Sequence, residues 1–98
     1  MKYLIISFKS RNELYGFANI LKSNGIYLSI INSPKSIGSG CMLCIKTDFR
    51  NLNKILQLIR QFQPKSFLGL YSFQSTTNGD QILRIMWNKT FINYWLFC

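Results

Sequence analysis

The segment from Ser33 to Asp48 reads SPKSIGSGCMLCIKTD, and the rest of the chain is arranged around it. It opens with a proline, continues through a run of glycine and serine, and ends in an apolar stretch that contains Cys41 and Cys44. Glycine and proline favour bends, whereas the apolar residues that follow favour a buried strand. The segment therefore predicts a loop over 34–40, then a strand over Cys41–Thr47, with Cys41 at their junction.

Apolar patterns outside this segment predict three further strands. Tyr3–Phe8 is a continuous apolar run, typical of a strand that is buried on both faces. Ile26–Ile31 alternates between apolar and polar residues, which indicates a half-exposed strand near a sheet edge. Phe67–Phe73 is a fourth strand, which Gly69 weakens.

Helical spacing predicts helices near 11–23 and 51–62. Ser10 and Glu13 fit a capping box at the start of the first helix, and Asn24-Gly25 is a stop signal at its end. Asp48 and Asn51 are the candidate caps of the second. The apolar positions expected to face the sheet are Leu14, Phe17, Ala18, Leu21, Leu52, Ile55, Leu56 and Ile59.

The order strand–helix–strand, twice over, predicts an α+β, ferredoxin-like βαββαβ fold. It has an antiparallel four-stranded sheet with the first and third strands in the middle, and both helices on one face. We expect this domain over 1–75 and a C-terminal extension over 76–98. The extension is rich in aromatic residues, and the sequence leaves open a strand or hairpin at a sheet edge, a dimer contact, a helix or an unordered tail.

The length and composition limit the classes of protein to which the chain can belong. The 98 residues are enough for one domain, and no apolar run approaches the roughly 20 residues of a membrane helix. Three cysteines and no signal-peptide pattern predict a cytoplasmic protein with reduced thiols. The formal charge of +9 is spread along the chain and forms no stripe, so we interpret it as a solubility feature and expect no nucleic-acid partner.

The residue inventory disfavours the common enzyme classes. The chain has no histidine, which removes Ser-His-Asp and Cys-His sites and the commonest metal ligand. The acidic residues Glu13, Asp48 and Asp80 are widely spaced, which argues against paired-carboxylate chemistry and a carboxylate metal cage. We therefore expect no metal site and no cofactor.

The two cysteines of the central segment are expected to have different roles. In a strand, Cys41 and Cys44 would be about 10 Å apart at Cα and on opposite faces, beyond the roughly 7 Å limit of a disulfide. Cys44 is expected to be a small core residue. Cys41 lies in the same stretch as Lys35, whose charge would favour the reactive thiolate, although a lone cysteine is commonly just a buried hydrophobe.

The pattern Pro34-Lys35-x-Ile37-x-Ser39-x-Cys41 resembles the signature of a small bacterial family of selenium/sulfur (Se/S) carrier-like proteins, a domain of unknown function. The resemblance extends from about Tyr3 to about Phe73. It implies Cys41 as the sulfur- or selenium-carrying thiol, and a binding loop of Pro34, Lys35, Gly38, Ser39 and Gly40. The chain departs from the pattern at Met42, where the family usually has glycine, at Gly38, where it often has serine, and at Cys44, where a small residue is usual.

The resemblance implies a small carrier that relays sulfur or selenium between enzymes as a persulfide or selenosulfide, with a cysteine desulfurase or another sulfur- or selenium-transfer protein as partner. The alternative is a non-catalytic ferredoxin-like binding or regulatory module without thiol chemistry, with a homodimer left open. RNA binding through the uncovered sheet face is disfavoured, because Cys41–Thr47 contains no aromatic residue to match Tyr3 and Phe8.

Overall fold

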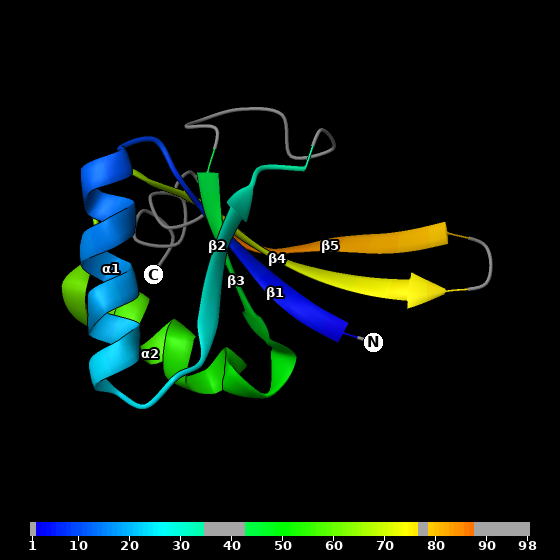
Figure 1. Cartoon of the computed structure of the whole chain (residues 1–98), viewed down its shortest axis with the longest axis horizontal. Coiled ribbons are helices and arrows are strands. Elements are labelled where there is room, and N and C mark those ends of the chain that lie inside the picture. The colour runs from blue at the N-terminus through cyan, green and yellow to red at the C-terminus, as the bar shows by residue number, and fades with distance from the viewer. Residues whose placement is uncertain (1, 35–42, 77–78, 88–98) are drawn as a thin grey trace, which may run out of the picture.

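A computed structural model describes residues 2–34, 43–76 and 79–87 of the chain. Figure 1 shows two helices packed on one side of a twisted sheet. The predicted α+β class is therefore confirmed. In chain order the elements are β1 (Lys2–Phe8), α1 (Arg11–Ser23), β2 (Leu28–Asn32), β3 (Leu43–Asp48), the 3-10 turn η1 (Phe49–Asn51), α2 (Leu52–Phe62), β4 (Phe67–Thr76) and β5 (Gly79–Trp87).

The sheet has five antiparallel strands in the order β2-β3-β1-β4-β5. The predicted sheet had four strands, and the structure corrects this because β5 pairs with β4 and extends that edge. The apolar strand β1 lies at the centre, where Ile6 is paired with Ile45 on β3 and Leu70 on β4. The predicted pairing of the first and third strands is confirmed, as is the edge position of β2.

Both helices bury one apolar face against the sheet. Leu14, Phe17, Ala18 and Leu21 of α1 are buried, as predicted, because they recur at helical spacing on one side. On α2 the predicted Ile55 and Ile59 are buried and Leu52 and Leu56 are half-buried, while Leu58, which was not predicted, is buried. They pack against Leu4, Ile6, Phe8, Ile45, Phe67 and Leu70 from the central strands.

Neither helix is long or apolar enough to cross a membrane, and the same holds for all helical segments within 2–34, 43–76 and 79–87.

The β4–β5 pair extends away from both helices, as Figure 1 shows at the right. Leu83 of β5 is 62% exposed and Ile82 is 37% exposed, because neither α1 nor α2 covers this end of the sheet. A strand at the sheet edge was one of the structures expected for the extension, and residues 79–87 form it. Residues 88–98 lie outside the described ranges.

The ends of α1 follow the sequence signals in part. The Ser10 side chain accepts a hydrogen bond of 3.3 Å from the Glu13 backbone N–H, which is half of the predicted capping box. Gly25 has φ +76°, a left-handed conformation that glycine adopts without strain, and ends the helix as expected. Asp48 accepts from Arg50 N–H at the start of η1, whereas Asn51 makes no side-chain cap at α2.

The Glu13 carboxylate does not turn back to Ser10 but reaches the segment between α2 and β4. It accepts backbone hydrogen bonds from Lys65 at 3.1 Å and from Ser66 at 2.5 Å. Burial works to raise the pKa of Glu13, but the hydrogen bonds from Ser66 and Lys65 and the nearby Lys65 charge outweigh it, so its pKa is lowered from the ordinary 4.5. Glu13 therefore ties the first helix to the entry of β4.

Glu13→Gln should reduce the free energy of unfolding by about 1 kcal/mol at neutral pH, since each bond to an ionised acceptor is stronger than its neutral counterpart. Because the folded-state pKa of Glu13 is lowered, its contribution is present above the ordinary pKa of 4.5 and is lost as pH falls through the folded value. Urea unfolding of both proteins at pH 7 and at pH 3 measures this. If Glu13→Gln lowered the free energy of unfolding equally at pH 7 and pH 3, the ionised carboxylate of Glu13 would not be the cause.

Candidate functional site

The segment that resembles the carrier signature joins the adjacent ends of β2 and β3. Asn32 and Leu43, which flank it, are paired across these two antiparallel strands. Ser33 and Pro34 are half-buried at the start of the connection. The connection therefore leaves and re-enters the sheet at one end of its β2 edge.

The other predicted site residues lie outside the described residues: Lys35, Gly38, Ser39, Gly40 and Cys41. Their proximity to one another, the accessibility of Cys41, and the absence of a Cys41–Cys44 disulfide remain predictions. Of the predicted site residues, Pro34 alone is within the ranges described by the structure.

Cys44 is fully buried in the sheet, as expected for a core residue. It lies between Ser7 on β1 and Ile31 on β2, on the face turned away from the helices, which we term the second face. A second apolar cluster covers this face around Cys44, comprising Ile5, Tyr71 and Phe73 with the half-buried Tyr3 and Ile31. This burial favours a packing role for Cys44.

Ser7 is a buried polar residue that the sequence analysis did not single out. Its side chain is 1% exposed, and its Oγ has no hydrogen-bond partner among the described residues. On the second face it is flanked by Cys44 on β3 and by Gly69 on β4. Ser7 therefore lies near the end of the sheet from which the β2–β3 connection emerges. Its position as a hydroxyl within the apolar run Tyr3–Phe8 was the signal that could have identified it.

The opposite end of the sheet carries a hollow of about 360 Å³. Its lining comes from the starts of β1 and β2 and the end of β3, namely Lys2, Tyr3, Tyr27, Leu28, Ser29, Lys46, Thr47 and Asp48. Residues from three separate parts of the sequence therefore border this end of the sheet, with the Lys2 ammonium on the helix side and the Lys46 ammonium on the second face. The volume is at the small end of the range for ligand sites.

Both lysines are held against aromatic rings. The Lys46 Nζ lies 4.4 Å from the centroid of the Tyr3 ring, and the Lys2 Nζ lies 3.9 Å from that of the Phe49 ring. Such cation–π contacts orient an ammonium group without using its N–H donors. Tyr3 is itself stacked on Phe73, with the ring centroids 5.4 Å apart.

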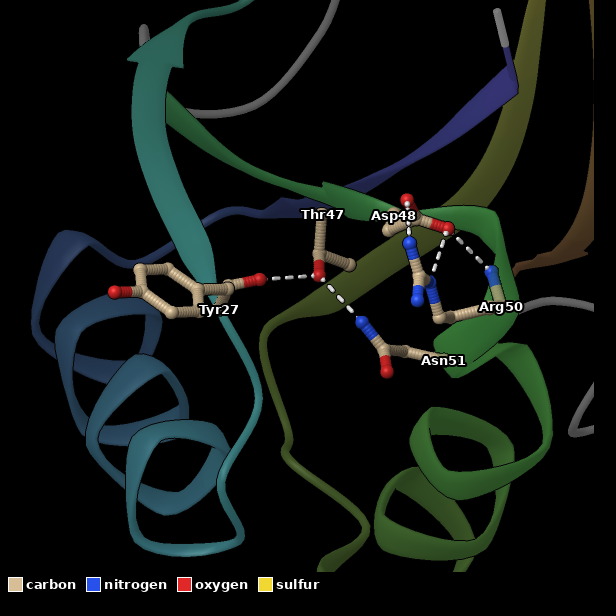
Figure 2. A network of polar contacts seen from close by, with 5 residues as sticks. All are labelled: Tyr27, Thr47, Asp48, Arg50 and Asn51. Carbon is tan, nitrogen blue, oxygen red and sulfur yellow. Dashed lines mark hydrogen bonds and ion pairs between the residues drawn. The ribbon is translucent and has the colours of Figure 1, made fainter.

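A polar network fixes the backbone beside the hollow (Figure 2). The Thr47 hydroxyl donates to the Tyr27 carbonyl oxygen at 2.6 Å and accepts from the Asn51 side-chain amide at 3.0 Å. This joins the start of β2 to the end of β3 and to η1. Figure 2 shows the Tyr27 ring turned away from these groups, and Tyr27 is 93% exposed.

Asp48, the acidic residue of the lining, is paired with Arg50. Its carboxylate accepts from the Arg50 backbone N–H at 2.8 Å and lies 3.3 Å from the Arg50 Nε (Figure 2). The backbone hydrogen bond, followed by the guanidinium of Arg50, holds the pKa of Asp48 below its ordinary value. Arg50 is therefore the counter-ion of Asp48. Within the described ranges no three His, Cys, Asp or Glu residues are grouped as a metal site would require.

Comparison with known proteins gives one match. Residues 2–79 match the family model described as "Putative Se/S carrier protein-like". The match spans most of the chain, includes the whole β2–β3 connection, and ends where β5 begins. No curated protein and no solved structure matches the chain.

Proposed function

Because the chain belongs to the Putative Se/S carrier protein-like family, we propose that it carries sulfur or selenium on the thiol of Cys41. The observation that supports this most is that the family match includes the whole segment from Pro34 to Cys41. The burial of Cys44 adds support, because it leaves Cys41 as the better candidate of the two cysteines in this segment. Cys41 is at the junction where glycine gives way to the apolar strand sequence.

The proposed transfer is a thiol–persulfide exchange. The Cys41 thiolate attacks the terminal sulfur of a persulfide on a donor cysteine, and a new S–S bond forms on Cys41. The donor S–S bond breaks, its electron pair stays on the donor sulfur, and the donor leaves as a thiolate. The terminal sulfur keeps its oxidation state, so the step needs no external oxidant. The selenium version has a selenosulfide donor and leaves a selenosulfide on Cys41.

The donor in this proposal is a cysteine desulfurase or another sulfur- or selenium-transfer protein. The chain has no histidine, so acid–base groups for the exchange would come from that partner. Lys35 would lower the pKa of the Cys41 thiol by its charge, while Pro34, Gly38, Ser39 and Gly40 would shape the approach to the sulfur. A reducing compartment such as the cytoplasm would keep the unloaded thiol available.

Incubation with a cysteine desulfurase and cysteine should load one sulfur atom onto the wild type. Intact mass spectrometry should show this gain in the wild type and in Cys44→Ala, and its loss in Cys41→Ser. Cys44→Ala is the matched control, because it removes the other thiol of the same segment. If the wild type and Cys41→Ser gained the same amount of sulfur, the proposal that Cys41 is the carrier thiol would be wrong.

Alkylation by iodoacetamide in the native protein provides a second measurement. Cys41 should react faster than Cys44, with a midpoint below the roughly 8.5 of an ordinary thiol, because only the thiolate reacts. Cys44 should react slowly, since its side chain is fully buried. Site-by-site mass analysis against pH separates the two. If Cys41 reacted no faster than Cys44, the thiol would not be activated.

We also infer that residues 1–75 are a ferredoxin-like βαββαβ unit, to which residues 76–98 are added. The element order up to β4 supports this, as does the end of the family match at residue 79.

The exposed Leu83 on the edge strand β5 supports a further proposal, a homodimer that pairs at this edge of the sheet.

A binding module without thiol chemistry is the second candidate. The specific observation in its favour is the hollow bordered by Lys2 and Lys46, which lies at the end of the sheet opposite the β2–β3 connection and has no part in the proposed exchange. A module would fail to load sulfur and would still bind a ligand there.

A further inference from the structure

We propose that the outer edge of β5 binds the same edge of a second copy of this chain, in the register that places Asp80 of each copy opposite Arg84 of the other. Among the strands in the described part of the chain, β5 has β4 as its one neighbour, so no strand of those ranges lies on its other side. The register specifies the homodimer proposed above and rests on that homodimer, but it is independent of sulfur transfer.

The β4–β5 pair presents this edge away from the helices. Figure 1 shows both strands extending to the right, clear of α1 and α2, so a second copy can approach the edge without meeting either helix. Ile82 is 37% exposed and Leu83 is 62% exposed, and successive residues of a strand lie on opposite faces of the sheet. An edge strand with exposed apolar residues on both faces is a template for pairing with another chain.

Two-fold symmetry limits the possible registers. In an antiparallel pair of identical strands, one residue lies on the axis opposite its own copy, and residues equally far before and after it lie opposite each other. With Ile82 on the axis, Asp80 lies opposite Arg84 of the second copy. Moving the axis to Leu83 places Arg84 opposite Ile82, and moving it to Arg84 brings two like charges together. Opposite charges across two strands stabilise a pair and like charges destabilise it, which favours the axis at Ile82.

The second face supplies the apolar part of the contact. Ile82 is paired with Phe73 of β4 and Arg84 with Tyr71, so Ile82 and Arg84 lie on the face that carries the cluster around Cys44. In the proposed register the two Ile82 residues meet next to Phe73 of each copy, and the apolar cover of this face continues across the axis. The Arg84 guanidinium carbon lies 5.7 Å from the centroid of the Tyr71 ring. Such a ring contact orients a guanidinium without using its N–H donors.

The size of the contact predicts a reversible dimer. It consists of residues 79–85 of each copy, which is small beside the interfaces of permanent complexes. Charged pairs at an exposed rim contribute little affinity and mainly fix the register. We therefore expect a monomer–dimer equilibrium with a dissociation constant of about micromolar or weaker.

Charge reversals test the register in the full chain. Asp80→Arg and Arg84→Asp should each weaken dimerisation at least about tenfold, because two like-charge pairs then lie across the axis. The double variant Asp80→Arg/Arg84→Asp should return to within about threefold of the wild type, since each copy again offers opposite charges to the other. Sedimentation equilibrium with a reducing agent present measures the dissociation constants.

The two single variants also separate the pairing from a general charge effect. Arg84→Asp lowers the net charge of +9 and Asp80→Arg raises it, so long-range repulsion alone would strengthen one dimer and weaken the other. The proposed pairing weakens both. Arg11→Asp is the matched control, because it makes the same change of charge at an exposed position at the start of α1. It should not weaken dimerisation by more than about twofold.

A disulfide on the axis is an independent test. Residues opposite each other in antiparallel strands have Cα atoms about 4.5–5.5 Å apart, within the range of a disulfide. With Cys41→Ser and Cys98→Ser in the background, Ile82→Cys should form a covalent dimer on mild oxidation. Gln81→Cys should form far less, because the two copies of residue 81 would be diagonal neighbours about 8 Å apart, beyond the roughly 7 Å limit.

Three results would overturn the proposal. They are a wild type that stays monomeric up to millimolar concentration, a double charge variant that dimerises no better than the single ones, and equal crosslinking of Gln81→Cys and Ile82→Cys. Sulfur loading of Cys41, measured on the wild type, keeps the two proposals apart. A dimer that does not load sulfur rejects the carrier alone, and a monomer that loads sulfur rejects the dimer alone.

Discussion

Leu21→Ala and Ile55→Ala should each lower the free energy of unfolding by about 2–5 kcal/mol. Both side chains are fully buried between a helix and the sheet, one on α1 and one on α2. Truncation removes the buried methyl groups and leaves a cavity that the close-packed surroundings fill only in part. Because domains of this size are stabilised by only about 5–15 kcal/mol, either change removes a large share of the total.

The matched control is Lys22→Ala, next to Leu21 but exposed on the outer side of α1. It should cost less than about 0.5 kcal/mol, as surface substitutions commonly do. Urea unfolding followed by circular dichroism compares the three variants with the wild type. Equal midpoints for Leu21→Ala and Lys22→Ala would show that the assigned helix faces are wrong.

Gly69→Ala should destabilise the fold by about 1–3 kcal/mol, because it overpacks the second face. A methyl group at Gly69 would lie 2.9 Å from both Cε1 and the hydroxyl oxygen of Tyr71. Tyr71 is 9% exposed within the cluster that contains Ile5 and Phe73, so its ring has little room to move. The glycine is needed here for close approach, not for its backbone angles.

Gly16→Ala is the control for Gly69→Ala, since it is the same chemical change. A methyl group at Gly16 of α1 has no neighbour within 4 Å, so the variant should gain about 0.5–1 kcal/mol from helix propensity. The Gly69→Ala/Tyr71→Ala double variant tests the cause. If the clash explains the loss, the two single effects will not add.

The helices could be predicted from the sequence because their signals are local. The apolar stripe of α1, from Leu14 to Leu21, repeats at helical spacing, and Gly25 marks the end. The role of Glu13 could not be predicted, since its partners at Lys65 and Ser66 are brought near only by the packing of α1 against the loop before β4. A capping box and this long-range contact look identical in the sequence.

The number of strands was harder to predict. Gly79–Trp87 pairs with β4, but its exposed Leu83 and Ile82 obscure the alternation of a strand with one buried face. Edge strands are specified less strongly by burial than central ones, as the contrast with β1 shows, in which all residues from Leu4 to Phe8 are buried.

The two candidate sites also differ in how far the sequence could predict them. Pro34–Cys41 is contiguous, so a linear pattern could identify it. The hollow at the other end of the sheet is lined by Lys2 on β1, Tyr27 just before β2 and Lys46 on β3, and the register of these strands was not known from the sequence. The ring stacked on Tyr3 is Phe73 of β4, a strand that the comparison of aromatic residues on the first and third strands did not include.

The central position of β1 has a consequence for how the protein is made. Its partners are β3 and β4, so Lys2 finds its neighbour Gln74 only after most of the chain has been synthesised. Local pairs such as β2 with β3 can form on the ribosome, but the middle of the sheet cannot close until β4 has been made. Until then the apolar edge of β1 remains without its β4 partner. A nascent chain that ends before residue 67 should therefore be far more sensitive to protease than one that extends beyond residue 76.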